Sequence, residues 1–136
     1  MSPITIPYHL VIPFLVGLII LICIIVFKKK FTIKKYQQNL WISLIVFFSI
    51  YILFVGISIY EELSLQIKLN KYDLNKDGFF NSKEVKMEGF NETMNGVVHD
   101  VGRNFSIITS AIFAVIVSGS ILIIGLLFEK FSKRLH

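Results

Sequence analysis

The sequence predicts an all-α integral membrane protein with three transmembrane helices and an extramembrane helix–loop–helix between the second and the third. The 136 residues are 54% apolar and 17% charged, and the mean hydropathy is +0.71. Residues 1–27, 36–60 and 104–128 contain no Lys, Arg, Asp or Glu. A soluble domain distributes charged residues over its whole surface, so this composition excludes the soluble and disordered classes of protein.

Three apolar runs, at 10–27, 40–59 and 105–128, are each long enough to cross a bilayer. A helix of about 20 residues spans ~30 Å of hydrocarbon. None of the runs has the polar stripe that a helix of a soluble bundle carries. No basic residue precedes the first run and Lys28 follows it directly, so we expect a retained span and not a cleaved signal peptide.

Basic residues next to the apolar runs predict the orientation of the chain. Residues 28–35 contain five Lys, and the C-terminal tail contains Lys130, Lys133 and Arg134. The positive-inside rule places both stretches in the cytoplasm, with the N-terminus and residues 61–104 outside. The net charge of +5 is therefore a topology signal, and no nucleic-acid partner is expected. The expected location is the plasma membrane or a bacterial inner membrane.

These boundaries divide the chain into four segments. Residues 1–39 hold the first span and a basic cytoplasmic loop, and residues 40–60 hold the second span. Residues 61–104 form the extracytoplasmic segment, and residues 105–136 hold the third span and a basic cytoplasmic tail. No ionisable side chain lies within a span, which argues against a self-contained pump or carrier.

The third span has a face of small residues that recur every four positions. They are Ser106, Ser110, Ala114 and Ser118. Such a face lets another helix approach closely. Two alternatives follow. The face packs within this chain, with Gly56 of the second span as its counterpart, or it contacts another membrane subunit or a second copy of the chain.

Residues 73–84 contain the one motif in the sequence with recognisable chemistry. Oxygen-bearing side chains recur at alternate positions, and Gly78 provides the backbone freedom that a sharp turn requires. Ca²⁺ is a hard cation that takes six to eight oxygen ligands. The predicted ligands are Asp73, Asn75, Asp77, the backbone carbonyl of Phe79, Asn81 and both carboxylate oxygens of Glu84. A metal-free loop and a different cation are the alternatives.

The motif resembles an EF-hand of the calmodulin type, over the loop and its flanks at residues 63–90. The apolar face of an entering helix is formed by Leu65, Leu69 and Tyr72. Glu88 and Gly89 interrupt that pattern after the loop, so we expect a short or kinked exiting helix. EF-hands usually work in pairs, and Phe80 holds the position that contacts a second loop. Either another subunit supplies that loop, or the membrane helices support this one.

The sequence shows no nucleophile–base pair, phosphate-binding loop or redox motif, so we do not expect an enzyme acting alone. It predicts a calcium-binding multi-pass membrane protein, a small accessory or assembly subunit of a larger membrane complex. Ca²⁺ would clamp the loop between the second and third spans. The alternative is a homo-oligomeric channel or transporter that Ca²⁺ gates. The expected partners are the lipid bilayer and other membrane subunits or further copies of the chain.

Overall fold

The chain folds into helices in a computed structural model that describes residues 6–31, 35–75, 77–98 and 101–132. The helices are α1 (Tyr8–Phe31), α2 (Lys35–Leu69), α3 (Phe90–Val98), α4 (Val101–Asn104) and α5 (Ser106–Ser132). These described ranges contain no strand. The all-α part of the predicted fold class is therefore confirmed.

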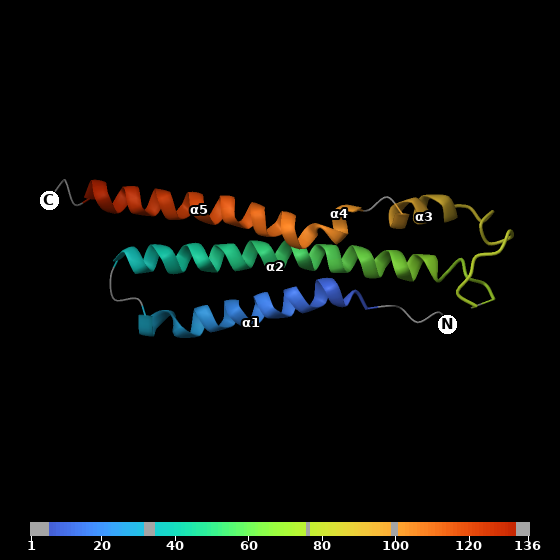
Figure 1. The fold of residues 1–136 in the computed structure, drawn as a ribbon, viewed down its shortest axis with the longest axis horizontal. Coiled ribbons are helices and arrows are strands. Elements are labelled where there is room, and N and C mark those ends of the chain that lie inside the picture. Colours follow the sequence, from blue (N-terminus) through green and yellow to red (C-terminus); the bar gives the residue numbers. More distant parts are fainter. Residues whose placement is uncertain (1–5, 32–34, 76, 99–100, 133–136) are drawn as a thin grey trace.

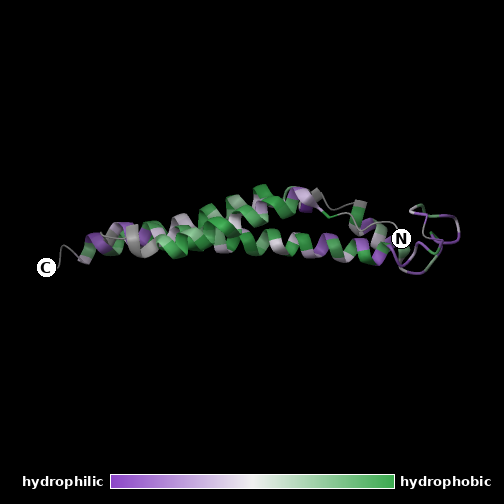
Figure 2. Ribbon diagram, turned by 90° about the horizontal axis from the view of Figure 1, so that it is seen from below, coloured by the Kyte–Doolittle hydropathy of each residue, from purple (hydrophilic) through white to green (hydrophobic). Residues whose placement is uncertain are grey.

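Three of the helices are long and apolar enough to cross a membrane, over Tyr8–Phe27, Tyr36–Leu69 and Ser106–Ser132. They coincide with the three apolar runs of the sequence and support the predicted integral membrane protein. Figure 2 shows hydrophobic residues along the three helices, whereas hydrophilic residues are concentrated in the loop beyond α2 and towards the helix ends.

The longest helix, α2, lies between α1 and α5 and packs against both (Figure 1). Its 35 residues extend about 52 Å at 1.5 Å per residue, which is longer than the ~30 Å of bilayer hydrocarbon. The helix that enters the predicted metal loop is therefore a continuation of the second span, and it ends at Leu69. The loop lies at the far end of the molecule, and α3 and α4 lead back from it towards α5 (Figure 1).

The contact between α1 and α2 uses two glycines. A Cβ atom added at Gly17 would lie 3.3 Å from the ring of Tyr51, and one added at Gly56 would lie 3.2 Å from the ring of Phe14. Each glycine thus accommodates an aromatic ring of the opposite helix. The prediction that Gly56 faces the third span was wrong. Because α2 is apolar on all sides, its sequence does not indicate whether a small residue on this helix contacts α1 or α5.

The small-residue face of α5 is buried at all four of its positions, and α2 is the helix that packs along it. The hydroxyl of Ser43 on α2 donates a hydrogen bond to the backbone carbonyl of Ser118 at 2.7 Å. The rings of Phe54 and Phe113 meet edge to face, with centroids 5.3 Å apart. Packing within the chain, the first of the two alternatives, accounts for the burial of this face.

We expect Ala114→Leu to destabilise the contact between α2 and α5. Ala114 is fully buried, and a larger side chain in a packed site costs about 1–3 kcal/mol. Gly119→Leu is the matched control on the same helix, because nothing lies within 4 Å of a Cβ added there. The measurement is the unfolding of the full chain in detergent micelles by SDS titration. Equal midpoints for the two variants would contradict the interface.

Candidate metal site

The predicted metal ligands lie in an irregular loop between α2 and α3, which is described over residues 70–75 and 77–89 and consists mostly of turns and bends. Gly78, which follows the third predicted ligand, has a φ angle of 83°. In this left-handed region an L-residue with a side chain costs roughly 1–2 kcal/mol. Gly78 therefore adopts a backbone conformation that a residue with a side chain would adopt only at a cost, as its place in the turn predicted.

Asp73 opens the loop and is buried, with 6% of its surface exposed. Its Oδ2 atom accepts a hydrogen bond from the backbone N–H of Gly78 at 3.0 Å. Its Oδ1 atom is buried and has no hydrogen-bond partner. A buried carboxylate oxygen without a partner is costly, because its water has been removed and nothing replaces it.

Glu84 closes the loop and is completely buried. Its Oε1 atom accepts hydrogen bonds from the backbone N–H groups of Leu74, at 2.8 Å, and Asn75, at 3.4 Å. Its Oε2 atom accepts one from the N–H of Asn81 at 2.8 Å. One carboxylate thus holds the start of the loop against its end.

The remaining side-chain ligands form local turns on the exposed side of the loop. The amide of Asn75 donates from Nδ2 to Oδ2 of Asp77 at 2.7 Å, and its Oδ1 accepts from the N–H of Asp77 at 3.3 Å. The other carboxylate oxygen of Asp77 accepts from the N–H of Phe79 at 2.8 Å. Asn81 accepts from the N–H groups of Lys83 and Glu84. These side chains set the path of the backbone between Asp73 and Glu84.

The loop brings its two ends together, but it does not gather the carboxylates around one point. Within the described ranges, no three His, Cys, Asp or Glu side chains lie close enough together to hold a metal ion. Asp77 is exposed and is engaged with local amides. All six predicted ligands bind through oxygen, and three of them are carboxylates while the other three are side-chain amide or backbone carbonyl groups. This donor chemistry fits a hard cation, and Oδ1 of Asp73 is the atom that lacks a partner.

The chain after the loop differs from the expected exiting helix. Residues 82–86 form turns, with single hydrogen bonds from the N–H of Val85 to Asn81 and from the N–H of Met87 to Glu84. The next helix, α3, begins only at Phe90. Gly89 precedes it with a φ angle of 82°, and a Cβ atom there would lie 2.8 Å from the hydroxyl oxygen of Tyr72. This close approach and the left-handed backbone explain why no helix runs from Glu84 into α3.

Three aromatic rings connect the loop to α3. The rings of Tyr72 and Phe80, from the two sides of the loop, meet the ring of Phe90 edge to face at centroid distances of 5.5 Å and 4.9 Å. Phe90 is buried, and the Tyr72 hydroxyl donates to the carbonyl of Glu88 at 3.4 Å. In this chain the ring of Phe80 therefore packs on its own helix α3. Its predicted contact with a second loop stays a prediction.

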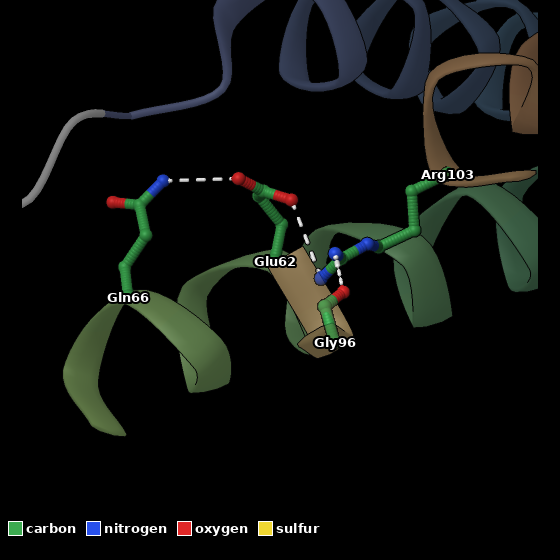
Figure 3. A network of polar contacts seen from close by, with 4 residues as sticks. All are labelled: Glu62, Gln66, Gly96 and Arg103. Atoms are coloured by element: carbon green, nitrogen blue, oxygen red, sulfur yellow. Dashed lines mark hydrogen bonds and ion pairs between the residues drawn. The ribbon is translucent and has the colours of Figure 1, made fainter. Parts of the chain in front are cut away.

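The sequence did not reveal an ion pair between Glu62 on α2 and Arg103 on α4, with 3.4 Å between nitrogen and oxygen (Figure 3). Asp100, three positions before Arg103 in the sequence, lies outside the described residues. A signal for the observed pair does exist. Glu62 lies close to the end of the second apolar run, and Arg103 is the last charged residue before the third.

Comparisons of the chain with protein-family models, with curated proteins and with solved structures found no match.

We expect Glu84→Ala to open the loop even in a calcium chelator. The substitution leaves the N–H groups of Leu74, Asn75 and Asn81 without their acceptor, and a lost acceptor costs about 1–3 kcal/mol. Amide hydrogen exchange at these residues should therefore accelerate by about tenfold. Glu88→Ala removes an exposed carboxylate nearby and serves as the control. Unchanged exchange in Glu84→Ala would contradict the described hydrogen bonds.

Proposed function

We propose that this chain is a calcium-binding membrane protein in which the EF-hand-like loop of residues 73–84 holds one Ca²⁺. The observation that supports this proposal most strongly is a pair of buried carboxylates, Asp73 and Glu84, at the two ends of the loop. Neither forms an ion pair with a cationic side chain among the described residues. Buried charges are normally paired with an opposite charge or bound to a metal.

The remaining predicted ligands would complete an oxygen coordination shell around these two carboxylates. Asn75, Asp77 and Asn81 supply side-chain oxygens, and Phe79 supplies its carbonyl. Glu84 would exchange its amide hydrogen bonds for bonds to the cation, which lowers the net gain on binding. In the orientation predicted from the basic residues, the loop faces the outside of the cell. Dissociation constants of about 10⁻⁴–10⁻³ M are typical of extracellular EF-type modules.

The role that we propose is that of a small accessory or assembly subunit of a larger membrane complex, with Ca²⁺ clamping the loop between the second and third spans. Two large apolar side chains support a docking role for the loop, because Leu74 is 64% exposed and Phe79 is 78% exposed. The N–H groups of both residues donate hydrogen bonds into the loop, to Glu84 and Asp77 respectively. Covering these two side chains with another subunit would remove apolar surface from water, which is favourable.

The calcium proposal predicts opposite effects of Asp73→Asn with and without the metal. In a chelator the variant should be more stable than wild type, because it removes an uncompensated buried charge and keeps an acceptor for Gly78. Added Ca²⁺ should stabilise wild type by about 1.4 kcal/mol at tenfold the dissociation constant, and it should leave the variant unchanged. The measurement is thermal unfolding of the full chain in detergent.

Glu88→Gln is the matched control, since it neutralises an exposed carboxylate outside the ligand set. It should respond to Ca²⁺ as wild type does, and Mg²⁺ at equal concentration should have a smaller effect. A wild-type melting curve that ignores Ca²⁺, together with no heat of binding in calorimetry, would refute the proposal.

The subunit proposal predicts that other proteins co-purify with this chain from its native membrane in fixed stoichiometry. Phe79→Ser should weaken this association and leave the response to Ca²⁺ unchanged, because the proposed ligand at this position is the backbone carbonyl. Ser82→Ala, at an exposed position of the same loop, is the control. A discrete ring of identical chains without other proteins would contradict the proposal.

A further inference from the structure

A buried arginine connects three helices at the base of the loop segment (Figure 3). Arg103 on α4 is 5% exposed. Its guanidinium forms the ion pair with Glu62 on α2, and its NH2 group donates a hydrogen bond to the backbone carbonyl of Gly96 on α3 at 2.6 Å. The other oxygen of Glu62 accepts from the side-chain amide of Gln66, one turn further along α2, at 3.2 Å. The two carboxylate oxygens are therefore both engaged.

This ion pair lies where the second and third apolar helices approach their polar ends. Glu62 follows the uncharged part of α2, which ends at Tyr60, and Arg103 precedes the start of α5 at Ser106 by three positions. An arginine with a planar fork of donors can bind a carboxylate and a carbonyl together, which a lysine does less well. The pair thus fixes the segment that leads into α5 onto the outer part of α2.

A continuous series of contacts connects the 73–84 loop to this pair. Phe80 of the loop packs on Phe90, the first residue of α3. Gly96, near the other end of α3, lies against α2, since a Cβ atom there would be 3.3 Å from the side chain of Leu65. The carbonyl of Gly96 is the one that Arg103 binds. The loop, α3, α4 and α2 are therefore in contact through named side chains.

We propose that the Glu62–Arg103 ion pair is a latch that couples cation binding in the 73–84 loop to the packing of α4 and the third span against α2. This inference rests on the proposed function and extends it to a regulatory contact outside the metal ligands. With the cation bound, the loop fixes Phe80 and Phe90, α3 keeps Gly96 within reach of Arg103, and the latch closes. Because coupling is reciprocal, opening the latch weakens cation binding at the distant loop.

The test is calcium titration by calorimetry of the full chain in lipid nanodiscs, for wild type, Glu62→Gln and Glu61→Gln. The two variants remove the same charge from neighbouring positions, but Glu61 is exposed and Glu62 holds Arg103. We expect Glu62→Gln to raise the dissociation constant about fivefold or more, the lower end of typical coupling factors. Glu61→Gln should remain within about twofold of wild type, which is below that range.

Arg103→Lys keeps the positive charge but loses the planar guanidinium that reaches both Glu62 and Gly96, so we expect it to weaken Ca²⁺ binding as well.

A second measurement does not depend on the folding of either latch variant. Spin labels at Ile67 and Gly102, both exposed, in a Cys23→Ser background report the distance between α2 and α4. In the otherwise wild-type chain, Ca²⁺ should narrow the distribution of this distance relative to a chelator.

The outcomes separate the latch from the calcium site itself. If wild type binds no Ca²⁺, the proposed function fails. If wild type binds Ca²⁺ but Glu62→Gln binds it equally well, the latch is refuted and the calcium site stands. A distance distribution that is the same with and without Ca²⁺ in the calcium-binding protein also refutes the latch.

Discussion

The whole structure depends on α2 as a continuous helix, because the other elements take their positions from contacts with it. Between apolar helices in a bilayer no hydrophobic driving force exists, so association relies on close approach and on polar contacts. α2 provides both. Gly56 receives a ring of α1, and Ser43 binds the backbone of α5. Further along, Leu65 and Glu62 hold α3 and α4.

This arrangement also explains how a loop with little regular structure keeps a defined shape. Asp73 lies four residues beyond the end of α2, after turns at 70–72 whose N–H groups bond to carbonyls of the last turn of α2, so one end of the loop is anchored to the longest helix of the chain. Glu84 binds the N–H of Leu74 and thereby returns the other end to the same place. Two carboxylates are consequently buried near a rigid helix end. Their burial removes both carboxylates from water, and backbone N–H groups bind three of the four oxygens, whereas Oδ1 of Asp73 has no hydrogen-bond partner.

The sequence was sufficient for those features that depend on local composition. The charge-free runs predicted the three long helices, and the position of Gly78 predicted a sharp turn in the loop, where the structure gives this residue a φ angle of 83°. Features that depend on distant contacts were missed. The face of Gly56 was assigned to the wrong helix, since a uniformly apolar helix has no polar side to orient it. The Glu62–Arg103 pair was not predicted because its two residues belong to different helices.

The segment between the loop and α5 is the part whose shape depends most on its surroundings. α3 has nine residues and α4 has four, and helices shorter than about 12 residues are marginally stable in water by themselves. Gly96 lies within α3 and lowers its helix propensity further. The segment is therefore held by Phe90 at one end and by Arg103 at the other. Because α3 has little stability of its own, the contacts of Phe90 and of Arg103 must both form for this segment to keep its place between the loop and α5.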